Sequence, residues 1–132
     1  MERAKDLMTS NLITLETSMS LVDVLNIFVD KKLTSLPVIS AVGKPLGLLT
    51  EQALVKGMVR VQGEKIQNAK VEHIEDLIEE PFFVNTEDSF FRVTESLIDN
   101  RVGRVLVLDE GNRLVGIISP RDLFDRFLIL QM

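Results

Sequence analysis

The chain has 132 residues, no cysteine and a formal net charge of −5 at pH 7. The lack of cysteine excludes disulfides and thiolate chemistry and fits a cytoplasmic location, while the acidic balance argues against nucleic-acid binding. Hydrophobic residues make up 45% of the sequence, but no uncharged apolar run reaches the ~20 residues of a membrane span. Because Glu2, Lys5 and Asp6 begin the chain without an apolar stretch, we expect no signal peptide.

The first half of the chain predicts a short helical lead-in followed by strand, helix, strand, strand and helix. Ser20 and Thr50 are favourable N-cap residues, and apolar residues after Ser20 recur at i, i+3, i+4 and i+7, which indicates one apolar helix face. The strands are aliphatic runs bounded by polar or turn residues. The expected elements cover residues 2–8, 12–15, 20–32, 35–39, 45–49 and 50–59.

A polar stretch over residues 61–70 contains Gly63 and is typical of a linker. The second half then repeats the order of the first. Ser89 is expected to cap its first long helix, and residues 109–112 supply turn chemistry before the last strand. The expected elements cover residues 73–78, 82–84, 89–97, 104–108, 114–118 and 120–128.

The last strand runs directly into Ser119-Pro120-Arg121-Asp122. Ser119 suits an N-cap, proline suits the first helical position, and Asp122 falls at the third. One interpretation is a capping box, which is common. The other is a nucleotide site, because free helix amides can face phosphate and a carboxylate can accept hydrogen bonds from a ribose diol.

This stretch occurs twice. Gly47 aligns with Gly116, 69 positions later, and the same offset matches Ser20 with Ser89 and Thr50 with Ser119. A duplicated unit of this size indicates two copies of one supersecondary arrangement.

Gly116-Ile117-Ile118-Ser119-Pro120-Arg121-Asp122 resembles the motif of the cystathionine-beta-synthase (CBS) domain family, and Ser35 to Ile39 looks like that family's second strand. The resemblance implies an α/β (α+β) fold of tandem CBS repeats, each strand-helix-strand-strand-helix, related by a pseudo-twofold axis. The repeats would cover residues 1–60 and 71–132, joined by the linker 61–70 in one compact module. The first copy departs from the motif, since Ala53 stands where the family has aspartate.

Many members of this family bind adenosine-containing ligands in clefts between the repeats. Carried over, the resemblance gives Asp122 the ribose hydroxyls, Ser119 and Arg121 the phosphate, and Ile117 the pocket lining. The first repeat would add Ile13 near the adenine, with Leu33, Thr34, Pro37 and Thr9 around it. The opposite cleft would hold Leu48, Thr50, Ala53, Phe83, Val102 and Gly103. Without a carboxylate at position 53 we expect this second cleft to bind weakly or not at all.

The resemblance therefore predicts a regulatory module that senses AMP, ADP, ATP or a related adenosyl ligand and modulates an unknown partner. We expect no obligatory cofactor and no metal, because one histidine and no cysteine make no ligand cluster. Catalysis is not expected, and His73 is interpreted as a surface residue of its lead-in. Family members commonly pair through their helices, so the apolar residues Phe124, Phe127, Leu128, Ile129 and Leu130 predict a homodimer. The alternative is a structural dimerisation module that binds no nucleotide.

Overall fold

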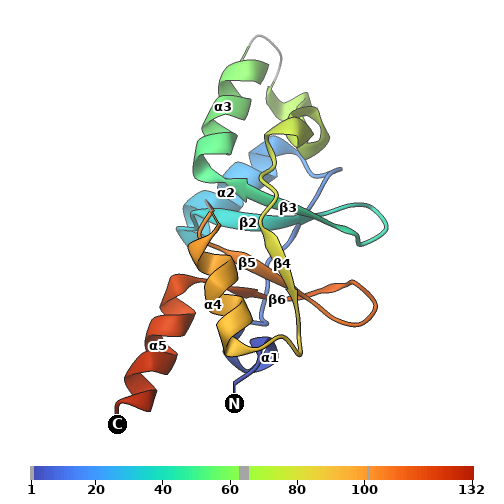
Figure 1. Ribbon diagram of the computed structural model, residues 1–132. Helices are drawn as coiled ribbons and strands as arrows, with labels where there is room; N and C mark the ends of the chain where they lie inside the picture. The colour runs from blue at the N-terminus through green and yellow to red at the C-terminus, as the bar shows by residue number, and fades with distance from the viewer. Residues whose placement is uncertain (1, 63–65, 101) are drawn as a thin grey trace. The chain divides into compact units, whose positions relative to one another are not determined.

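The computed structural model describes residues 2–62, 66–100 and 102–132 and is drawn in Figure 1. It divides into two compact units. The first-motif unit is Ile13–Glu80 and contains Gly47 and Thr50. The second-motif unit combines Met1–Leu12 with Pro81–Met132 and contains Gly116 and Asp122.

The first-motif unit is built on a three-stranded sheet in the order β1-β2-β3. β1 (Leu15–Glu16) runs parallel to β2 (Ser35–Ile39), and β2 pairs antiparallel with β3 (Pro45–Thr50). Among its described residues, two α-helices and two 3-10 segments complete the unit. They are α2 (Leu21–Lys31), α3 (Glu51–Val61), η1 (Ile66–Asn68) and η2 (Val71–Leu77).

The second-motif unit has the same sheet order and the same pairing directions in β4-β5-β6. Its elements are α1 (Ala4–Leu7), β4 (Phe82–Asn85), α4 (Phe90–Ile98), β5 (Val105–Leu108), β6 (Leu114–Ile118) and α5 (Pro120–Leu130). The mixed α/β class and the repeated strand-helix-strand-strand-helix order are thus confirmed.

The predicted helix starts are also confirmed by their caps. The hydroxyls of Ser20, Thr50 and Ser89 each accept the backbone N–H three residues later, at 3.1 Å. Each cap satisfies one of the amides that the first helical turn leaves without an intrahelical acceptor. α2 ends where Lys32 adopts the left-handed conformation, with φ of +52°.

Three elements differ from expectation. β1 begins at Leu15 rather than Leu12, because only Leu15 and Glu16 reach pairing partners on β2. The second lead-in is 3-10 helix, with a break in helical geometry at Ile74. In the expected linker, α3 continues to Val61, η1 forms and Ala69 is buried. Residues 63–65 of that stretch lie outside the described residues.

Each lead-in belongs to the unit that contains the motif of the other repeat, and it packs there against the elements of that motif. α1 contacts α5 and β6, while η2 contacts α3. At the first lead-in, Lys5 Nζ lies 2.8 Å from Glu87 Oε1. At the second, Arg60 donates two hydrogen bonds to the Asp76 carboxylate, at 2.6 and 2.9 Å, and these lower the pKa of Asp76. Each lead-in is therefore joined to its unit by an ion pair between exposed side chains, in addition to apolar packing.

The motif glycines are explained by this packing. A Cβ at Gly47 would lie 2.1 Å from the backbone oxygen of Glu79, and a Cβ at Gly116 would lie 2.3 Å from Met8 Sδ. Gly47 also has φ of +146°, a conformation that side chains rarely adopt. At Gly47 the lead-in backbone can cross the motif strand only because this position lacks a side chain, whereas at Gly116 the side chain of Met8 occupies the corresponding space.

We predict that Gly47→Ala destabilises the protein by at least about 1–3 kcal/mol, the usual cost of overpacking, because its clash is with rigid backbone. Gly111→Ala is the matched control, since its Cβ would meet only side-chain atoms at 3.4 Å and beyond, and it should stay within about 0.5 kcal/mol of wild type. Chemical denaturation followed by circular dichroism measures both. Equal stability of the two variants would contradict the crossing as the reason for the glycine.

Candidate functional site

The second motif places a carboxylate at the start of α5. β6 ends at Ile118, Ser119 is the N-cap, and Asp122 is the third helical residue. The Ser119 N–H donates to Asp122 Oδ2 at 2.8 Å, and the Ser119 hydroxyl lies 3.2 Å from the same oxygen. The carboxylate is half-buried and lies at the positive end of the helix dipole.

Thr9 stands at the end of the first lead-in, as Glu79 does at the end of the second, and each pairs with a motif strand. The N–H and C=O of Thr9 exchange hydrogen bonds with Ile117 at 2.9 and 3.0 Å, and its hydroxyl donates to Asp122 Oδ1 at 3.1 Å. The structure therefore brings Thr9, Ile117, Ser119 and Asp122 together within one unit. Arg121 lies beside them in the first turn of α5, with an exposed side chain.

The other residues of the first predicted set lie in the first-motif unit. Pro37 is buried in β2 opposite Leu48, and Leu33 follows the end of α2, where its N–H donates to Phe28. Thr34 is exposed, and its carbonyl accepts the N–H of Glu51 at the start of α3. Ile13 is exposed just before β1.

The second predicted set is divided in the same way. In the first-motif unit, Thr50 caps α3 by accepting the N–H of Ala53, and Leu48 and Ala53 are buried. In the second-motif unit, Phe83 is exposed on β4, while Val102 and Gly103 form a turn in which Asn100 accepts the N–H of Val102 at 2.8 Å.

Two features were missed by the sequence reasoning. Glu79 pairs with Leu48 as Thr9 pairs with Ile117. The repeat could have indicated this, but the two lead-ins do not keep the 69-residue offset.

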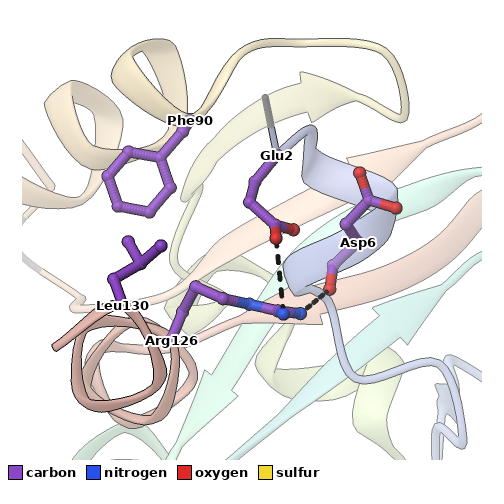
Figure 2. Close-up of a pocket in the computed structure, with 5 residues that line it drawn as sticks. All are labelled: Glu2, Asp6, Phe90, Arg126 and Leu130. Atoms are coloured by element: carbon purple, nitrogen blue, oxygen red, sulfur yellow. Dashed lines mark hydrogen bonds and ion pairs between the residues drawn. The ribbon is translucent and has the colours of Figure 1, made fainter. Parts of the chain in front are cut away.

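The second missed feature is a pocket of about 590 Å³ in the second-motif unit, shown in Figure 2. Arg126 points toward the carboxylate of Glu2, at 3.4 Å, and donates to the backbone oxygen of Asp6 at 2.7 Å. Phe90 and Leu130 supply apolar lining. None of these residues belongs to the predicted site.

The arrangement around Asp122 suits recognition rather than bond making. A carboxylate, hydroxyls and helix amides can hold a polyol phosphate. The single histidine, His73, accepts the Lys70 N–H at 2.9 Å and caps its own lead-in. Among the described residues no cluster of acidic or histidine side chains could hold a metal ion. Within the same three ranges, no helix has the length and apolar character needed to cross a membrane.

Comparison with known families decides the identity of this fold, because the CBS domain matches residues 4–60 and again residues 71–129. The chain belongs to the CBS domain family. The structure of CBSX2 in complex with AMP covers 100% of both chains with a TM-score of 0.80 at 24% identity. CBSX2 is a CBS-pair protein of Arabidopsis thaliana. At this identity the likeness shows the fold of a CBS pair.

Two curated relatives come from Methanocaldococcus jannaschii. The uncharacterized protein MJ1225 is 27% identical over 92% of this chain and 41% of its own length. Inosine-5'-monophosphate dehydrogenase is 25% identical over 95% of this chain and 23% of its own length. The chain therefore spans less than half the length of either relative.

We predict that Asp122→Ala lowers the free energy of unfolding by about 1 kcal/mol, because the substitution removes the carboxylate that caps α5. Asp125→Ala is the control: it removes an exposed carboxylate from the same helix and should cost less than about 0.5 kcal/mol. Thermal and chemical denaturation compare the two variants. Identical losses would mean that the contacts with Ser119 and Thr9 do not stabilise the helix start.

Proposed function

We propose that this CBS pair is a cytoplasmic regulatory module that binds an adenine nucleotide through Asp122 and modulates a partner protein. The observation that carries the proposal is the half-buried carboxylate at the α5 N-terminus, which already accepts hydrogen bonds from the N–H and hydroxyl of Ser119 and from the hydroxyl of Thr9. A site that orders its carboxylate before binding loses little conformational entropy when the ligand arrives.

In this proposal a ribose diol donates to the two oxygens of Asp122. The hydroxyls of Thr9 and Ser119, which now donate to them, can rotate away, while the Ser119 N–H keeps the carboxylate oriented. Arg121 and the first-turn amides would face the phosphate, and Ile117 would line the pocket. The family resemblance assigns the adenine contacts to Ile13, Leu33, Thr34 and Pro37, and this assignment stays a prediction.

The AMP complex of CBSX2 supports an adenosine ligand, since that protein shares the CBS-pair fold over its whole length. The proposal specifies the partner protein only as an enzyme or a transporter. The curated relatives are longer than this chain, and one of them is an enzyme, inosine-5'-monophosphate dehydrogenase. In this proposal the CBS pair changes the behaviour of an enzyme or transporter and does not itself carry out catalysis.

The first-motif unit would bind the same ligand more weakly. Its equivalent helix position is Ala53, whose methyl group cannot accept a hydrogen bond from ribose. The family resemblance assigns Leu48, Thr50, Phe83, Val102 and Gly103 to this second site, and that assignment stays a prediction. The two sites therefore differ in affinity because of one helix position.

A structural dimerisation module is the second candidate. Exposed apolar side chains favour it: Ile98 is 82% exposed and Phe91 73% exposed on α4, and Phe124 is 60% exposed on α5. Such surfaces are typical of interfaces. In that case Asp122 would serve only as a helix cap. Both candidate functions predict a homodimer, so nucleotide binding is the property that distinguishes them.

We predict that titration calorimetry detects AMP, ADP or ATP binding and that Asp122→Ala weakens the tighter site about ten- to a hundredfold. A hydrogen bond to a charged group contributes about 1.5–3 kcal/mol, which corresponds to this range. Asp125→Ala should bind as wild type does. Equal affinity in wild type and Asp122→Ala, or no heat with any of the three nucleotides at millimolar concentration, would leave the structural module as the function.

We predict that light scattering at micromolar concentration gives twice the 14.9 kDa mass of the chain. Phe124→Asp should shift the mass toward that of the monomer, because it would bury an unpaired charge in an apolar interface. Val42→Asp is the control, since Val42 is 90% exposed in the turn between β2 and β3. A wild-type mass of 14.9 kDa would contradict the homodimer.

A further inference from the structure

The two lead-ins place different side chains at the same point of their motifs. Thr9 exchanges two backbone hydrogen bonds with Ile117, the residue after Gly116, at 2.9 and 3.0 Å. Glu79 exchanges two with Leu48, the residue after Gly47, both at 2.8 Å. Because the pairing partners are equivalent, Thr9 and Glu79 occupy equivalent backbone positions, although they do not align by the repeat offset.

From that position Thr9 meets the third residue of the following helix. Its hydroxyl lies 3.1 Å from Asp122 Oδ1. The corresponding third residue of α3 is Ala53, whose N–H is bonded to the Thr50 hydroxyl at 3.1 Å. One unit thus has a hydroxyl on the lead-in and a carboxylate on the helix, and the other has a carboxylate on the lead-in and a methyl group on the helix.

The Glu79 carboxylate is free to serve this site. Glu79 is exposed, and within the described ranges its side chain has no hydrogen-bond or ion-pair partner. The glutamate carboxyl group stands two carbons beyond Cβ, whereas the threonine hydroxyl is attached to Cβ itself. From an equivalent backbone position it can therefore reach the volume that the Asp122 carboxylate fills in the other unit.

We propose that Glu79 supplies the ribose-binding carboxylate of the first-motif unit in place of the aspartate missing at Ala53. This inference rests on the proposed nucleotide-binding function. It also gives a physical reason for unequal sites. Asp122 is held by Ser119 and Thr9 before any ligand binds, whereas Glu79 must give up rotamer freedom on binding, so its site is weaker but not inactive.

The test is AMP titration calorimetry in the Asp122→Ala background, which leaves the first-motif site to be measured. Glu79→Gln should weaken the remaining binding about tenfold or more, since the amide loses the charged acceptor. Glu80→Gln is the control, because it removes the neighbouring exposed carboxylate and should leave the affinity unchanged. If Asp122→Ala does not fold, Glu79→Gln and Glu80→Gln are made in the wild-type protein instead. Their AMP titrations are then fitted to two sites, and the weaker site is compared.

Three results separate the two proposals. A wild-type protein that binds AMP at one site, lost in Asp122→Ala, overturns the role of Glu79 and leaves the proposed function intact. Equal effects of Glu79→Gln and Glu80→Gln also overturn it. No AMP binding by the wild type overturns the proposed function itself.

A reciprocal exchange tests the cause directly. Glu79→Thr should abolish the weaker site, and Glu79→Thr combined with Ala53→Asp should restore it with an affinity near that of the Asp122 site. The double variant recreates the hydroxyl–carboxylate pair of Thr9 and Asp122 in the other unit. Wild-type affinity in Glu79→Thr alone would overturn the inference.

Discussion

The pairing of each lead-in with a motif strand is the constraint on which both units depend. Two backbone hydrogen bonds join Thr9 to Ile117, and two join Glu79 to Leu48. Both crossings run over a motif glycine, where a Cβ would lie 2.1 Å from backbone at Gly47 and 2.3 Å from Met8 at Gly116. Packing against backbone therefore accounts for the glycine of the first motif, and at the second motif the side chain of Met8 fills the space above the glycine.

The same crossing assembles the chemistry of the site. It delivers the side chain of Thr9 to the start of α5, where the helix dipole and the Ser119 amide already hold the Asp122 carboxylate. The proposed recognition of a sugar would use the same carboxylate and hydroxyl groups that now cap the helix. Helix capping and the proposed nucleotide site are therefore compatible.

Duplication has preserved the framework of the two units and changed their side chains. Sheet order, strand directions and the serine caps of α2 and α4 are the same in both. The carboxylate proposed to bind the ligand is Asp122 on a helix in one unit and Glu79 at the end of a lead-in in the other. Each motif keeps its glycine, in contrast, where the lead-in crosses the strand.

The sequence by itself determined what depends on neighbours along the chain. The caps at Ser20, Thr50 and Ser89, the strand from Ser35 to Ile39 and the duplicated motif all follow from local hydrogen bonding and periodicity, and the CBS resemblance followed from the motif residues. Only the tertiary structure decided where the lead-ins pack. Thr9 and Asp122 are 113 positions apart, and the register at Glu79 is fixed by pairing with β3 and not by the repeat offset. Such contacts depend on strand pairing between distant segments, which no local pattern encodes.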